Sequence, residues 1–142
     1  VPGPGPPAER ARPAPPAARG SETILLVEDD DEVRALALRV LQATGYTVVD
    51  ASSGEQALRA VAAYEVAADL LATGVVMPGM GGRELAERLT AVTPGLRVLF
   101  LSGHTDDAAL RAGFGPAAHS LPKPFTPAEF AAKVREVLDA DR

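Results

Sequence analysis

The chain alternates short apolar runs with amphipathic segments, and this alternation is the feature that most constrains its fold. Residues 24–27 form a continuous apolar run, Ile-Leu-Leu-Val, which is typical of a strand buried on both faces of a sheet. Four further short segments are strand candidates: residues 46–51, 69–73, 96–101 and 117–121, of which the last has the weakest strand pattern. Helix-period segments separate and follow them, so the pattern predicts a parallel sheet covered by helices on both faces.

Five helices are expected, and local signals mark the ends of several. Ser53 and Gln56 have the spacing of a capping box, as do Thr126 and Glu129 before the last helix. Gly45 stands where the first helix should end. The helices are expected at about residues 33–41, 53–61, 85–92, 105–113 and 126–138, with the fourth the weakest.

The first 20 residues differ in texture from the rest of the chain. They hold seven of the 13 prolines and none of the large apolar residues Ile, Leu, Met, Phe, Trp or Tyr. Such a segment cannot bury enough apolar surface to offset its ordering entropy. We therefore predict a disordered Pro/Ala-rich linker at residues 1–20 and a single folded domain at 21–142. The start at Val1, in place of Met, predicts a piece of a longer protein with further domains upstream.

Composition excludes several classes of protein. The chain has no cysteine, which removes disulfide frameworks, Cys zinc sites and cysteine nucleophiles. A net charge of −5 argues against binding to nucleic acid, because that affinity comes from clustered Lys and Arg. No apolar run approaches the roughly 20 residues that a membrane span needs. We expect a cytoplasmic domain without membrane contact.

Polar residues gather where the predicted strands end. Glu28 and Asp29 follow the first strand, Ser102 follows the fourth and Lys123 follows the fifth. The carboxyl ends of parallel strands share one end of the sheet, where ligands of such folds bind. Carboxylate oxygens suit Mg²⁺, and a lysine with a hydroxyl suits the oxygens of a phosphoryl group.

Five segments together resemble the receiver domains of bacterial two-component signalling. They are ILLVEDDDEVR (24–34), GYTVVDASSGEQAL (45–58), DLLATGVVMPGMGGREL (69–85), VLFLSGHT (98–105) and LPKPF (121–125). The resemblance runs from about Glu22 to Asp139. It implies a flavodoxin-like, doubly wound α/β fold whose five parallel strands have the order 2-1-3-4-5, with five helices. It also implies an acidic pocket for Mg²⁺ and an aspartate that accepts a phosphoryl group from a phosphohistidine.

The resemblance assigns roles to individual residues. Glu28 and Asp29 match the acidic metal pair, and the backbone carbonyl of Val76 matches the third protein ligand. Ser102 matches the switch hydroxyl. In Lys123–Pro124, the lysine matches the one that contacts the phosphoryl oxygens, and the peptide bond is expected to be cis.

Two positions depart from the family pattern. Gly74 stands where the acceptor aspartate is expected, and Thr73 and Met77 on either side fix this register. Glycine offers neither a nucleophile nor a metal ligand, so we expect Mg²⁺ to bind weakly or not at all. Ser120 stands where an aromatic switch residue is expected. Natural degeneracy, an engineered block and a sequence error are three open origins for Gly74.

These observations lead to one main hypothesis and two alternatives. The main hypothesis is a receiver that is not phosphorylated at Gly74, from the C-terminal end of a hybrid sensor histidine kinase. It would dock a histidine kinase or a phosphotransfer domain, or form a homodimer through helix 105–113, strand 117–121 and the last helix. The first alternative is phosphotransfer through a neighbouring carboxylate such as Asp29. The second is a flavin-binding flavodoxin relative, which the acids at 28–32 disfavour because they would repel a phosphate.

Overall fold

Five parallel strands form one sheet in the order β2-β1-β3-β4-β5. The structure, a computed structural model, describes residues 20–64, 67–102 and 119–140. The strands are β1 (Thr23–Val27), β2 (Thr47–Ala51), β3 (Leu70–Gly74), β4 (Arg97–Ser102) and β5 (His119–Pro122). The predicted α/β class and strand order are confirmed.

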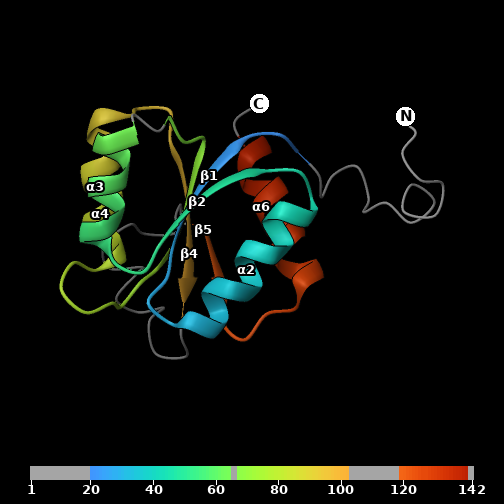
Figure 1. Ribbon diagram of the computed structural model, residues 1–142. Coiled ribbons are helices and arrows are strands. Elements are labelled where there is room, and N and C mark those ends of the chain that lie inside the picture. Colours follow the sequence, from blue (N-terminus) through green and yellow to red (C-terminus); the bar gives the residue numbers. More distant parts are fainter. Residues whose placement is uncertain (1–19, 65–66, 103–118, 141–142) are drawn as a thin grey trace.

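Helices cover both faces of this sheet. They are α2 (Asp31–Ala43), α3 (Gly54–Tyr64), α4 (Gly82–Val92) and α6 (Pro127–Asp139). Figure 1 shows α2 and α6 on one face and α3 and α4 on the other, as the two core clusters require. The helix predicted at 105–113 lies outside the described residues, as does the linker predicted at 1–20 except for its last residue. None of the described helices is long and apolar enough to span a membrane.

The position of β1 between two helical layers explains why its sequence is apolar without interruption. Ile24 and Leu26 belong to the core cluster that α2 and α6 cover. Leu25 and Val27 belong to the cluster under α3 and α4. All four side chains are fully buried, and each contributes roughly 1.5–3 kcal/mol relative to an exposed position. β1 therefore anchors both layers and holds the residue that follows it, Glu28, at a fixed place.

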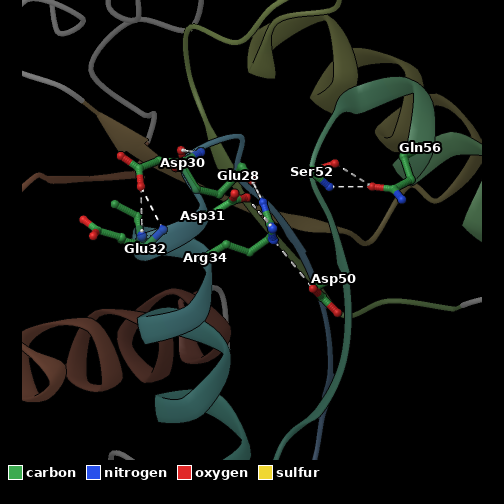
Figure 2. Close-up of polar contacts among 9 residues, drawn as sticks. Glu28, Asp30, Asp31, Glu32, Arg34, Asp50, Ser52 and Gln56 are labelled. Carbon is green, nitrogen blue, oxygen red and sulfur yellow. Dashed lines mark hydrogen bonds and ion pairs between the residues drawn. The ribbon is translucent and has the colours of Figure 1, made fainter.

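Two helices have well-formed N-terminal caps, of which that of α6 was predicted from the sequence. The side chain of Asp30 accepts hydrogen bonds from the backbone N–H groups of Glu32 and Val33 at 2.9 and 3.2 Å, and so caps α2 (Figure 2). Thr126 and Glu129 form a complete capping box on α6. Both caps satisfy backbone donors that would otherwise lack partners in the first helical turn.

The capping box predicted for α3 forms only in part. The N–H of Gln56 donates to the Ser53 hydroxyl at 3.1 Å, as expected. The Gln56 side chain accepts from the N–H of Ser52 at 2.6 Å instead of from that of Ser53 (Figure 2). The return bond is thus displaced by one residue, because the long glutamine side chain also accepts from the Ser52 hydroxyl.

Candidate functional site

Glu28 is a buried carboxylate at the carboxyl end of β1. Its side chain is 0% exposed. Its Oε2 accepts a hydrogen bond from the N–H of Asp30 at 3.0 Å, and its Oε1 lies 3.1 Å from the Nζ of Lys123. The structure therefore brings together two predicted site residues that lie far apart in the sequence.

The environment of Glu28 makes ionisation of its carboxyl group less favourable than in water. Burial has the largest effect and raises the pKa of Glu28, and the adjacent Asp29 carboxyl raises it further. The Asp30 N–H and the Lys123 ammonium both lower the pKa of Glu28, but the net direction is upward. A buried carboxylate of this kind needs a cation to remain ionised.

Lys123 follows the edge strand of the sheet, and its side chain extends towards Glu28 at the end of β1. It follows β5, and its N–H donates to the Ser102 carbonyl at 2.8 Å. Its side chain is 26% exposed, and the bond to Pro124 is cis, as expected. Since β3 and β4 lie between β1 and β5, the lysine side chain crosses the ends of both strands to reach Glu28.

Gly74 is the last residue of β3 and lies next to the Glu28 carboxylate. The strand had been expected to end at Thr73 and extends one residue further. A Cβ atom at Gly74 would lie 3.1 Å from the Oε1 of Glu28 and 3.5 Å from the Cγ of Met77. The carboxylate that contacts Lys123 therefore borders the space that a side chain at position 74 would enter.

Ser102 adds a buried hydroxyl to this end of the sheet. The residue is 0% exposed, and its Oγ has no hydrogen-bond partner among the described residues. The Oε1 of Glu28 also lacks a hydrogen bond of good geometry, although it forms an ion pair with Lys123. Each unsatisfied buried group costs about 1–3 kcal/mol. Two such oxygens lie at the carboxyl end of the strands, where ligands of such folds bind, and this makes them candidates for a functional site.

The buried carboxylate of the candidate Mg²⁺ pocket is already engaged by other groups. No group of three His, Cys, Asp or Glu side chains that could hold a metal occurs in the described part of the chain. Glu28 already binds the Asp30 N–H and the Lys123 ammonium, and Asp29 is exposed. Mg²⁺ is bound through one or two carboxylates with water completing its octahedral shell, and in this arrangement the ammonium of Lys123 holds the place of a cation at the Oε1 of Glu28.

Arg34 is a site residue that the sequence analysis missed. Its Nη1 donates to the Glu28 carbonyl at 2.7 Å, its Nη2 to Asp31 at 2.6 Å, and its Nε lies 3.7 Å from Asp50 (Figure 2). The guanidinium thus ties the acidic loop to α2 and β2. The spacing of Asp31 and Arg34 predicts an ion pair on the helix, but nothing local indicates the bond to the Glu28 carbonyl.

The remaining predicted positions lie at the edge of the sheet or away from the ion pair. Ser120 is half-buried on β5, beside Phe100 of β4. The side chain of Val76 is 69% exposed. Of the predicted dimer surface, the structure describes β5 and α6, with a groove of about 450 Å³ between them. It is lined by Leu121, Pro122, Pro124, Glu129, Ala132, Lys133 and Glu136.

Comparisons with known proteins agree with this geometry. Residues 24–135 match the model of the response regulator receiver domain. The sensor kinase CckA of Brucella abortus is 41% identical over 125 residues, which are 84% of this chain and 13% of that protein. The response regulator receiver protein CpdR of the same organism is 34% identical over 82% of this chain and 97% of its own length. The crystal structure of the receiver domain of the hybrid histidine kinase CckA is 34% identical, with a TM-score of 0.67 over 82% of this chain and 98% of that one.

Proposed function

Because this chain belongs to the response regulator receiver domain family, we propose that it is a two-component signalling module that takes no phosphoryl group at position 74. Receiver domains interact with histidine kinases or phosphotransfer proteins, bind Mg²⁺ at their acidic pocket and are generally signalling modules without enzymatic activity of their own. The observation that carries the proposal is Gly74. It lies where an acceptor carboxylate would stand beside Glu28 and Lys123.

The chemistry of phosphoryl acceptance supports this reading. An acyl phosphate forms only where a carboxylate oxygen attacks phosphorus, and glycine has no such atom. Glu28 is buried and already engaged with Lys123. Asp29 is exposed, but it would have to serve as metal ligand and nucleophile at once. The Asp29 route is therefore the weaker candidate.

The proposed partner is a histidine kinase or a histidine phosphotransfer domain, bound without phosphorylation of this chain. The similarity to CckA, a sensor kinase, supports a parent protein of the hybrid histidine kinase class acting in the cytoplasm. The net charge of −5 supports a protein partner over nucleic acid. The β5–α6 groove belongs to the surface on which we expect docking or homodimer formation.

Intact mass spectrometry tests the proposal directly. The domain is incubated with Mg²⁺ and acetyl phosphate, and we expect its mass to remain that of the unmodified chain. A phosphoryl adduct in stoichiometric yield would overturn the proposal. Peptide mapping of any such adduct locates it, and an adduct that persists in the variant Asp29→Asn would exclude the Asp29 route.

A matched pair of variants then asks whether the rest of the pocket is intact. We expect Gly74→Asp to accept a phosphoryl group in the presence of Mg²⁺ and Gly74→Ala to remain unmodified. Both add a Cβ that lies 3.1 Å from the Oε1 of Glu28, so they share the steric contact and differ in the carboxylate. If Gly74→Asp folds but stays unmodified, the loss of function extends beyond position 74.

A further inference from the structure

We infer that the Lys123 ammonium is the resident cation of the acidic pocket and excludes divalent metal from Glu28. The inference rests on the proposed function in that it concerns the same site. It adds that Lys123 supplies the positive charge beside Glu28 that a bound metal ion would otherwise supply. The juxtaposition that carries it is the 3.1 Å contact between Lys123 Nζ and Glu28 Oε1.

The burial of the two partners is unequal, and this sets the role of each. The Glu28 side chain is 0% exposed, whereas that of Lys123 is 26% exposed. A buried carboxylate without a partner is strongly unfavourable, while a partly exposed ammonium keeps some of its hydration. The glutamate therefore depends on the lysine more than the lysine depends on the glutamate.

Because position 74 is a glycine, Glu28 is the one buried carboxylate among the described residues that Lys123 can bind. Among the described residues, Glu28 is the only acidic side chain that is buried. Position 74 adds no side chain between β1 and the lysine that crosses from β5. Lys123 is thus committed to Glu28, and a metal bound to Oε1 would meet the ammonium at a distance where like charges repel strongly.

This inference differs from the simpler explanation of weak metal binding. If the missing carboxylate at position 74 were the whole cause, removing the lysine charge would leave Mg²⁺ affinity unchanged. If Lys123 excludes the metal, neutralising it should uncover Glu28 and Asp29 as ligands. The two explanations therefore predict different results for one substitution.

The experiment compares Mg²⁺ binding to the wild type, Lys123→Gln and Lys133→Gln. Binding is followed by isothermal calorimetry and by the rise in Tm with added MgCl₂, with NaCl adjusted to hold ionic strength constant. Lys133→Gln is the matched control, because it removes the same charge from a lysine that pairs with Glu136 on α6. We expect Lys123→Gln to bind Mg²⁺ about ten-fold more tightly or better, and the control to match the wild type.

Each outcome decides the question. Equal Mg²⁺ affinity in the wild type and Lys123→Gln overturns the inference, as does an equal gain in Lys133→Gln. If Lys123→Gln is unfolded without metal, recovery of its helical circular dichroism by millimolar Mg²⁺ supports the inference, and failure to recover contradicts it. The variant Lys123→Arg keeps a cation and should resemble the wild type. No arm depends on phosphodonor chemistry, so this inference and the proposed function can fail separately.

Discussion

The two ends of the sheet each hold a glutamate beside β1 paired with a basic residue from the last part of the chain. At the amino end, the Oε2 of Glu22 lies 2.7 Å from the Nη2 of Arg135. At the carboxyl end, the Oε1 of Glu28 lies 3.1 Å from the Nζ of Lys123. The pairs are alike in charge and in long sequence separation, yet their surroundings differ.

The difference lies in how well each carboxylate is satisfied. The hydrogen bond from Arg135 is the main cause that lowers the pKa of Glu22, and Arg135 also binds Asp139 at 2.8 Å. Burial is the main cause that raises the pKa of Glu28, and its Oε1 lacks a well-formed hydrogen bond. We therefore expect the amino-end pair to stabilise the fold and the carboxyl-end pair to be held in place at a cost in stability, as in functional sites.

We expect the largest loss of stability from a substitution at Gly82, where backbone atoms pack closely at the carboxyl end of the sheet. Gly82 begins α4, and its N–H donates to the Val75 carbonyl at 2.8 Å. A Cβ at Gly82 would overlap the carbonyl oxygen of Gly74 and lie 3.2 Å from the Cα of Val75. Because both obstacles are backbone, we expect Gly82→Ala to lower the free energy of unfolding by about 3 kcal/mol in urea denaturation.

The control for this substitution is Gly95→Ala, before β4 at the amino end. A Cβ at Gly95 meets nothing within 4 Å, so its stability should change by no more than about 0.5 kcal/mol. If both variants lose stability equally, the close backbone contact at Gly82 is not what limits that position.

The next effect tests whether the amino-end pair stabilises the fold. Arg135→Ala removes a side chain that is only 11% exposed and leaves Glu22 half-buried without its main partner. We expect a loss of about 2 kcal/mol in the free energy of unfolding. Arg88→Ala breaks the exposed pair with Glu84 at 2.8 Å and should cost about 0.3–0.5 kcal/mol. Equal losses in the two variants would show that the amino-end pair is no stronger than a surface ion pair.

The sequence predicts the centre of the sheet well because β1, β3 and most of β4 are buried on both faces. Continuous apolar runs such as residues 24–27 therefore mark strand positions without any knowledge of their neighbours. The cap of α6 was also predictable, because Thr126 and Glu129 lie within one turn of each other. The α3 cap was predicted only in part, since the Gln56 side chain can reach either of two adjacent N–H groups.

The candidate site was predictable in its location but not in its internal pairing. Parallel strands bring Glu28, Ser102 and Lys123 to one end of the sheet, and the structure confirms that placement. The contact between Lys123 and Glu28 joins residues that follow β5 and β1, two strands that are three places apart in the sheet, and no sequence spacing encodes it. The Glu22–Arg135 pair spans 113 residues and was missed for the same reason.

The sharpest test of the comparison replaces each glutamate by its neutral amide. At pH 7 to 8 we expect Glu22→Gln to lose about 1 kcal/mol of stability, because its hydrogen bonds to Arg135 lose their charge. We expect Glu28→Gln to gain about 1 kcal/mol, because a neutral group is easier to bury at that position. If the free energy of unfolding changes in the same direction in both variants, the two ends of the sheet do not differ in whether they stabilise a carboxylate.

The dependence of these differences on pH follows from the direction of each pKa shift. The pKa of Glu22 is lowered from its ordinary value of 4.5, so its stabilisation is present above that value and is lost as pH falls through the folded-state pKa. The pKa of Glu28 is raised from 4.5, so its destabilisation appears as pH rises from 4.5 through the folded-state pKa. Lowering pH from neutral should first remove the advantage of Glu28→Gln, above pH 4.5, and only below that value the disadvantage of Glu22→Gln. Urea denaturation of the wild type and both variants from pH 3 to pH 8 measures both windows, and the reverse order would contradict the assignment of the two ends.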